Sequence, residues 1–130
     1  METRLLVAGE RVAGEGDSLS VENPFTESEL ASVSLPSAEQ VDAAIAAARE
    51  AARSWAATPA IERGEMLHEV ATRMRARTDD LAELMTLEGG KPLIENSDEV
   101  GWTAAAFDYY AELGRNFAGR EIPAIKPTQL

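Results

Sequence analysis

The stretch SAEQVDAAIAAAREAARSW, residues 37–55, decides the largest element of the fold. It opens with a capping box, in which the Ser37 hydroxyl accepts a hydrogen bond from a free backbone amide and the Gln40 side chain reaches back. Apolar side chains then recur three and four positions apart, which predicts an amphipathic helix that packs through one stripe. That stripe is Val41, Ile45, Ala48, Ala52 and Trp55.

Three further helices follow, each marked by its own end signals. The second begins near Thr58-Pro59, where a cap residue precedes a proline at the first helical position. The third opens at 78–80 and stops at Gly89-Gly90, and the fourth runs from Pro92 or Asn96 to Leu113. The expected stripes are Leu67, Val70 and Met74 in the second helix, Leu81, Leu84, Met85 and Glu88 in the third, and Trp102, Ala106, Tyr109 and Leu113 in the fourth.

Residues 1–36 show period-2 alternation broken by glycine and proline, which is typical of short strands. Ala8-Gly9-Glu10 predicts a hairpin turn and 14–17 a second turn, while 19–21 and 30–35 alternate as strands. A dinucleotide loop at Gly14 and Gly16 is excluded, because Leu19 stands where the third glycine belongs. The sequence therefore predicts an α+β chain, with amino-terminal short antiparallel strands in 1–36, about four helices in 37–118 and an extended tail in 119–130.

Composition excludes several functions. The chain has 130 residues, a formal net charge of −11 and no cysteine. Such a charge repels phosphates, so neither nucleic acid nor an anionic membrane surface is an expected partner. Without cysteine there is no disulfide, thiolate zinc site, iron–sulfur cluster or cysteine nucleophile. The opening run, residues 1–8, is too short for a secretory segment or a membrane span, and we expect a cytoplasmic location.

Few residues suggest chemistry by type alone. The only histidine, His68, lacks a nucleophile and an orienting acid in a recognisable motif, and a surface histidine is the preferred interpretation. Arginines at 73, 75 and 77 are better explained as a solvated helix end than as an anion site. The acidic residues Glu95, Asp98 and Glu99 fit a helix start better than a cation loop.

The turn LEGGKP, residues 87–92, places Glu88 beside two glycines. A carboxylate with nearby backbone carbonyls can ligate a monovalent or divalent cation. An ordinary helix end with a surface lysine is the simpler interpretation. The helices also have alanine-rich second faces, which suit packing under another layer. The chain stops at 128–130 without a domain-ending signal, so we expect a piece of something larger.

Taken together, several segments resemble the amino-terminal part of an aldehyde dehydrogenase. They occur in the family's order over about a hundred residues, and independent matches multiply. The matching segments are Asn23-Pro24-Phe25-Thr26, the helix from Ser37 to Trp55, Glu62-Arg63 with Leu67, Leu87-Glu88-Gly89-Gly90-Lys91-Pro92, Tyr109-Tyr110-Ala111, and Gly119-Arg120-Glu121-Ile122-Pro123.

The resemblance implies an oxidation of an aldehyde to a carboxylic acid with NAD(P)+, within a larger Rossmann-like α/β fold. In the family a cysteine attacks the aldehyde, hydride passes to NAD(P)+, and a glutamate-activated water releases the acid. This chain holds no such cysteine, and the nucleotide cradle and the oxyanion asparagine fall beyond Leu130. We therefore expect no catalytic and no cofactor-binding residue here, and no activity of the chain alone. The implied partners are the rest of the dehydrogenase or sister subunits of a homo-oligomer, with features of the betaine or amino-aldehyde branch.

Two sites carry over from the resemblance. Some members hold Na+ or K+, and the matching ligands here are the backbone carbonyls of Val21 and Glu22 and the carboxylate of Glu88, where many members have Asp. The helix before Tyr109-Tyr110 lines the substrate tunnel in many members, which puts Glu99 and Trp102 near its mouth. A core position on the helix stripe is the preferred interpretation of Trp102.

A second hypothesis needs no larger enzyme. A free-standing acidic helical module would use its surplus of apolar helix surface to associate with itself or with a dehydrogenase subunit.

Overall fold

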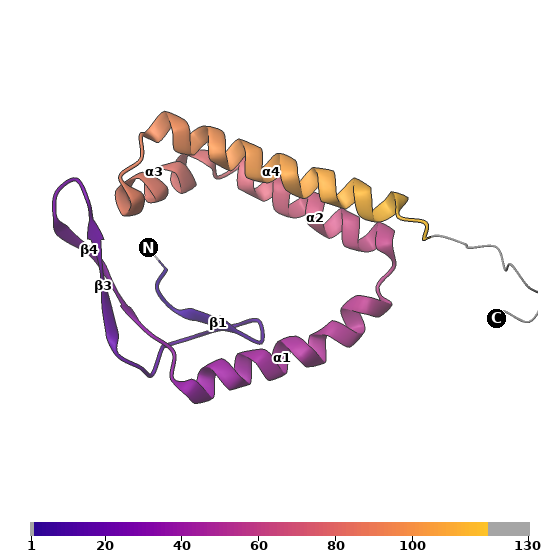
Figure 1. Ribbon diagram of the computed structural model, residues 1–130, viewed down its shortest axis with the longest axis horizontal. Coiled ribbons are helices and arrows are strands. Elements are labelled where there is room, and N and C mark those ends of the chain that lie inside the picture. Colours follow the sequence, from indigo (N-terminus) through magenta and orange to yellow (C-terminus); the bar gives the residue numbers. More distant parts are fainter. Residues whose placement is uncertain (1, 120–130) are drawn as a thin grey trace, which may run out of the picture.

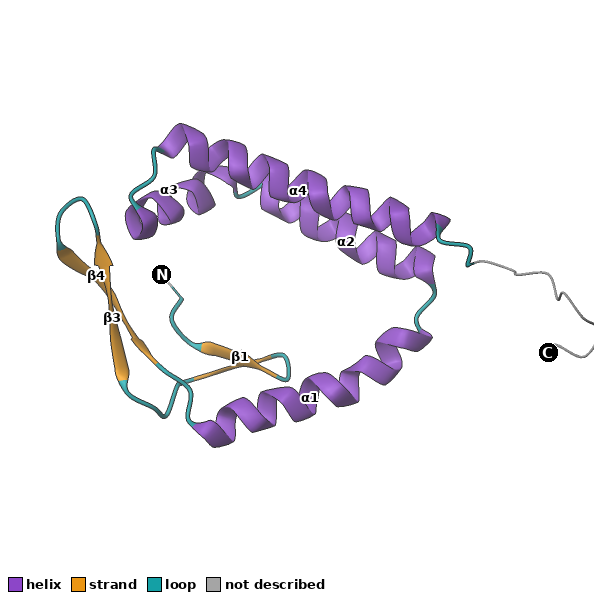
Figure 2. Ribbon diagram, in the orientation of Figure 1, coloured by secondary structure: helices purple, strands orange, loops and turns teal. Residues whose placement is uncertain are grey.

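Four short strands precede four helices in the computed structural model, which describes residues 2–119 (Figures 1 and 2). The strands form two separate antiparallel pairs and the helices follow in chain order, so the predicted α+β arrangement is confirmed. The tail segment 120–130, including most of the last matching motif, lies outside the described residues. The elements are β1 Leu5–Val7, β2 Glu10–Val12, β3 Ser18–Asn23, β4 Ser28–Ser34, α1 Ala38–Ala57, α2 Ala60–Arg75, α3 Thr78–Gly89 and α4 Leu93–Asn116.

The predicted first hairpin is present. β1 pairs with β2, and the two-residue turn Ala8-Gly9 has φ of 52° and 86°. Two successive positive φ angles are the signature of the turn whose twist matches that of paired strands. Glycine adopts this conformation freely, whereas Ala8 does so against its Cβ.

The second pair, β3 with β4, is longer and irregular. Its register shifts between Val21 and Glu22, which marks a bulge in the ladder. The connecting loop starts at Asn23, whose Oδ1 accepts a hydrogen bond of 2.9 Å from the Phe25 amide. Glu27 closes the loop by donating its amide to the Asn23 carbonyl at 2.8 Å.

The predicted turn at 14–17 is a bent connection between β2 and β3. Its glycines let the backbone pass close to the residues at the end of β4. The Gly16 amide donates to the Leu35 carbonyl at 2.8 Å. A Cβ on Gly14 would lie 2.1 Å from the Ser34 carbonyl oxygen. Only glycine therefore fits where this segment passes the end of β4.

The capping box of α1 is confirmed, but the expected burial of its stripe is not. The Ser37 hydroxyl accepts from the Gln40 amide, and α1 has no buried residue. Val41, Ile45 and Trp55 are 43%, 59% and 47% exposed. The β1–β2 hairpin instead lies beside the alanine face of α1, and the two border an open hollow. Residues that line this hollow include Leu6, Val7, Ala44, Ala47, Ala48 and Ala51.

α2, α3 and α4 meet in one helical layer (Figure 1). Small side chains form the core of this contact. α4 runs along α2, and a Cβ on Gly64 of α2 would come within 3.2 Å of the Ala111 carbonyl of α4. Such close packing selects Gly and Ala at the contact. The buried residues of the core are Ala71, Ala82, Val100, Ala104, Ala111 and the polar Asn96.

The predicted stripe of α4 faces away from this core. Trp102, Tyr109 and Leu113 are 69%, 63% and 46% exposed, so the preferred core position of Trp102 is wrong within residues 2–119. α4 thus carries a small-residue face against α2 and a large apolar face that is open. None of the helices between residues 2 and 119 is long and apolar enough to cross a membrane.

Candidate functional site

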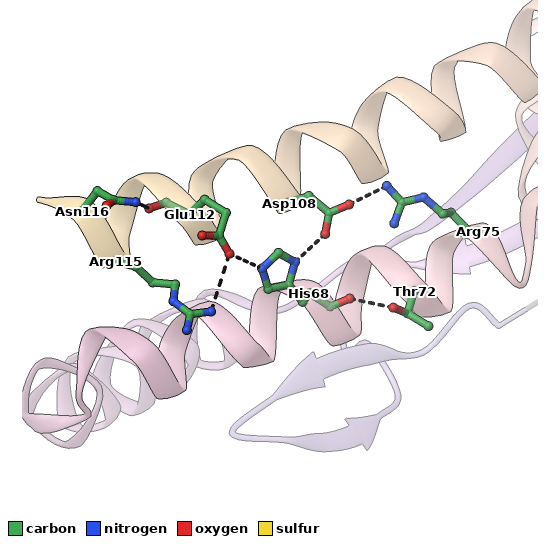
Figure 3. Close-up of polar contacts among 7 residues, drawn as sticks. All are labelled: His68, Thr72, Arg75, Asp108, Glu112, Arg115 and Asn116. Carbon is green, nitrogen blue, oxygen red and sulfur yellow. Dashed lines mark hydrogen bonds and ion pairs between the residues drawn. The ribbon is translucent and has the colours of Figure 1, made fainter.

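The most connected polar cluster joins α2 to α4 around His68 (Figure 3). The ring Nδ1 lies 2.6 Å from Asp108 Oδ1, and Nε2 lies 2.9 Å from Glu112 Oε1. Asp108 and Glu112 are four residues apart on α4 and share one face, so the ring fits between them. The His68 side chain keeps 35% of its surface exposed.

An arginine flanks each carboxylate of this cluster. Arg75, two turns after His68 on α2, donates to Asp108 Oδ2 at 2.5 Å. Arg115 lies 3.5 Å from Glu112 Oε1. The five side chains therefore alternate in charge from Arg75 to Arg115, with the imidazole at the centre.

The pKa values of the central groups move in opposite directions. Hydrogen bonds to Asp108 and then to Glu112 raise the pKa of His68 above its ordinary value. Hydrogen bonds from Arg75 and then from His68 lower the pKa of Asp108. Both shifts favour the charged forms, which strengthens the cluster electrostatically. Its groups join α2 to α4, and none of the five side chains is a serine, threonine or cysteine that could act as a nucleophile.

Sequence reasoning missed this cluster. His68 was expected at the surface, and its carboxylate partners stand 40 and 44 residues away. The i, i+4 spacing of Asp108 and Glu112 could have indicated two carboxylates on one helix face. It does not identify His68 as their partner, because that requires the register of α2 against α4. The arginine run does behave as a paired helix end, since Arg73 and Arg77 lie 2.6 and 3.7 Å from Glu69 and Asp80.

The Gly89-Gly90 turn ends α3 as predicted. Gly90 has a φ of 73°, and its amide donates to the Thr86 carbonyl at 2.9 Å. A Cβ on Gly90 would lie 2.9 Å from Cγ of Pro24, so this turn rests directly on the loop after β3. The structure thereby brings together the LEGGKP turn, between α3 and α4, and the Asn-Pro loop, between β3 and β4.

The residues matched to a cation site lie on these two segments. Val21 and Glu22 flank the bulge of β3, and Glu88 is an exposed side chain in the last turn of α3. Within residues 2–119, no three His, Asp or Glu side chains gather as a metal cluster. The donors on offer are oxygens only, which suits a hard cation.

Glu99 and Trp102 come together one turn apart on α4. Both border a shallow hollow with Met74 and Met85, at the meeting point of α2, α3 and α4. Glu99 accepts a hydrogen bond from the Lys91 ammonium, and Glu95 lies 3.8 Å from the same group. Two of the three acidic residues near the start of α4, Glu95 and Glu99, thus lie beside Lys91, in accord with the helix-start interpretation.

Comparison with known proteins adds the family. Residues 12–130 match the aldehyde dehydrogenase family. Over 119 residues the chain is 40% identical to the NADP(+) succinate-semialdehyde dehydrogenase GabD of Escherichia coli, covering 91% of this chain and 25% of that protein. Aminoaldehyde dehydrogenase 2 of Zea mays is 38% identical over 115 residues, covering 85% and 23%. The chain spans about a quarter of the length of these curated relatives.

Solved structures agree in fold. A NAD-dependent benzaldehyde dehydrogenase from Corynebacterium glutamicum superposes with a TM-score of 0.92 at 28% identity, over 98% of this chain and 28% of that one. A betaine aldehyde dehydrogenase from Staphylococcus aureus, in complex with NAD+, gives 0.91 at 29% identity over 97% and 26%. By sequence and by structure, this chain belongs to the aldehyde dehydrogenase family.

Proposed function

We propose that the chain is the amino-terminal portion of an NAD(P)+-dependent aldehyde dehydrogenase, which oxidises an aldehyde to a carboxylic acid, and that the chain alone is inactive. The observation that supports this is a family match over residues 12–130. The curated relatives are about four times as long as the part that this chain matches. The relatives are named for different aldehydes, so the substrate class stays at aldehyde.

Two absences of chemistry support inactivity. The 130 residues contain no cysteine, so a thiolate nucleophile has to come from outside this chain. A dinucleotide cradle needs a parallel strand, a glycine-rich loop and a helix in succession. Both sheets found in residues 2–119 are antiparallel pairs, so these residues do not fit the pyrophosphate of NAD(P)+. Binding and chemistry then fall to the remainder of the enzyme.

The test is direct. The 130-residue chain is purified, titrated with NAD+ and NADP+ in a calorimeter, and assayed for NAD(P)H formation with succinic semialdehyde, betaine aldehyde and benzaldehyde. We expect no saturable heat and no absorbance change. Micromolar binding of either nucleotide would overturn the assignment of the nucleotide site to the remainder of the enzyme.

The exposed apolar faces support a partner that covers them. Val41, Ile45 and Trp55 of α1 and Trp102 and Tyr109 of α4 are all more than two-fifths exposed. We expect the rest of the dehydrogenase, or sister subunits of a homo-oligomer, to bury them. The isolated chain should then bind an apolar dye. Covalent continuation into a complete dehydrogenase should abolish that binding.

The same surface carries the second candidate, an interaction module that associates with itself or with a dehydrogenase subunit. Light scattering on the purified chain separates the two. A discrete oligomer that no longer binds dye favours the module, whereas a dye-binding monomer favours the enzyme portion. A compact monomer with a cooperative transition would contradict the module.

We also propose a monovalent cation site formed by the carbonyls of Val21 and Glu22 and the carboxylate of Glu88, held together by the contact of Gly90 with Pro24. Thermal unfolding in NaCl, KCl and choline chloride at equal ionic strength tests it. One alkali cation should raise the Tm above choline, and Glu88→Gln should remove that difference. Equal Tm values in the three salts would reject the site.

Glu99 and Trp102 are proposed to face the substrate channel of the complete enzyme. Their shared hollow and the exposure of Trp102 support this. In the complete enzyme, Trp102→Ala should raise KM for the aldehyde several-fold with kcat nearly unchanged, because uniform binding is lost. Ile94→Ala, another exposed apolar change on α4, is the matched control. Equal effects of both changes would reject the assignment.

A further inference from the structure

Both nitrogens of the His68 ring face carboxylate oxygens, at 2.6 Å and 2.9 Å. Ionised carboxylates only accept hydrogen bonds, so each nitrogen has to donate. A neutral imidazole carries one N–H and would turn a lone pair toward the second carboxylate. The geometry therefore requires an imidazolium between Asp108 and Glu112.

We propose that His68 is a pH-controlled clamp: as an imidazolium it fastens α2 to α4 at two points, and its deprotonation releases one of them. His68 is the member of the cluster that contacts both carboxylates of α4. The pair of Arg115 with Glu112 lies within α4 and bridges nothing. The pair of Arg75 with Asp108 does bridge the helices and persists after deprotonation. Loss of the proton thus opens the Glu112 end of the α2–α4 contact first.

The other charged groups near the ring do not substitute for these partners. On α2, Glu69 pairs with Arg73 at 2.6 Å, and Glu65 borders a separate hollow with Glu62. On α4 the facing groups are Asp108 and Glu112, whose arginine partners are Arg75 of α2 and Arg115 of α4. Within residues 2–119, every hydrogen-bond and ion-pair partner of the ring comes from α4.

The side chains that are fully buried between α2 and α4 are small, whereas Leu67 of α2 and Phe107 of α4 are buried only in part. Ala71, Ala104 and Ala111 bury little area each, so apolar burial contributes modestly to holding α2 and α4 together. A doubly hydrogen-bonded imidazolium then adds a polar link between α2 and α4 beside the close contact of Gly64 with Ala111.

The single histidine makes the test clean, since its ring protons give the only imidazole signals in the NMR spectrum. The 130-residue chain is titrated with pH as wild type, Asp108→Asn and Glu112→Gln. The control is Glu69→Gln, which removes an equal charge one residue from His68 without touching the ring. We expect a wild-type midpoint above 6.5. Each clamp variant should lower the midpoint clearly, and the control should leave it nearly unchanged.

Two outcomes would overturn the clamp. One is a wild-type midpoint at or below 6.5, which means that the carboxylates do not hold the proton. The other is an equal fall in Glu69→Gln, which means that the general negative field of the chain sets the value. The wild-type titration decides even where a variant fails to fold, and an unfolded wild-type chain would itself return the unshifted value.

Discussion

The side-chain amide of Gln40 donates a 2.8 Å hydrogen bond to the carbonyl of Ala13, 27 residues earlier. The carbonyl oxygen of the same side chain accepts from the amides of Glu15 and Ser37, at 3.0 and 3.1 Å. One residue therefore both completes the capping box of α1 and fastens the β2–β3 connection onto the helix start. The strands and the helices are tied together at this point.

Gln40→Ala should destabilise the chain by about 1–2 kcal/mol, since it removes a cap partner and leaves backbone groups unpaired. Urea unfolding followed by circular dichroism measures the loss. Gln40→Glu is the matched control, because it keeps the acceptor for the two amides and loses only the donor to Ala13. It should cost less than the alanine change, and the reverse order would contradict the tie.

Asn96→Leu should cost about 1–3 kcal/mol, although it places an apolar residue in a buried position. Asn96 is 2% exposed. Its Nδ2 donates to Thr86 Oγ1 at 2.8 Å and to the Lys91 carbonyl at 3.2 Å. Leucine leaves both acceptors without this donor where α3 turns into α4.

The control for Asn96→Leu is Ser97→Ala, the next residue on α4, whose exposed hydroxyl contacts only a carbonyl of its own helix. It should change the unfolding midpoint little. A Leu variant as stable as wild type would show that the buried amide is dispensable.

Two glycine-to-alanine changes should have opposite signs. At Gly14 the new Cβ would meet the Ser34 carbonyl oxygen at 2.1 Å, so the backbone has to move and stability falls by about 1–3 kcal/mol. Gly101, inside α4, has nothing within 4 Å of the new Cβ, so alanine should add about 0.5–1 kcal/mol through helix propensity. Thermal melts of both variants check the signs, and a neutral Gly14→Ala would contradict the close approach.

Local sequence signals predicted the helices and strands well, because helix caps and turns depend on residues that are adjacent in the sequence. The Ser37–Gln40 box, the Ala8-Gly9 hairpin and the Gly90 helix end all formed as expected. The buried faces of α1 and α4 were predicted wrongly, since large apolar residues were assigned to the core. Close helix contact selects alanine and glycine and leaves Trp102 of α4 outside. Ile45 is exposed for another reason, since α1 packs mainly beside the β1–β2 hairpin and buries no residue.

The His68 cluster illustrates a second limit. Its members are ordinary surface residues in sequence, and only the register between two helices, set by Gly64 against Ala111, brings them together. A long-range contact of this kind leaves no local pattern. The channel residues and the carbonyls of Val21 and Glu22 were named by resemblance, whereas Glu88 was also suggested by its place beside two glycines, and all of them remain predictions.

The thermal stability of the chain should depend on pH in the direction that the pKa shifts of His68 and Asp108 predict. The folded pKa of His68 is raised above 6.5, so its stabilisation is complete below pH 6.5 and is lost as pH rises through the folded value. The folded pKa of Asp108 is lowered below 3.8, so its stabilisation is complete above pH 3.8 and is lost as pH falls through the folded value. The Tm should therefore be highest between these limits and fall on either side.

His68→Gln isolates the alkaline limb of this profile. Glutamine keeps an amide group that can donate but never carries charge, so the variant should melt lower than wild type near pH 5.5 and approach it above the folded pKa of His68, where wild type has also lost its imidazolium. Thr72→Ala, which removes a hydroxyl bonded to the His68 backbone carbonyl, is the control for local disturbance of α2. Its Tm should run parallel to that of wild type at every pH. A gap between wild type and His68→Gln that stays constant with pH would mean that the ring acts by packing and not by charge.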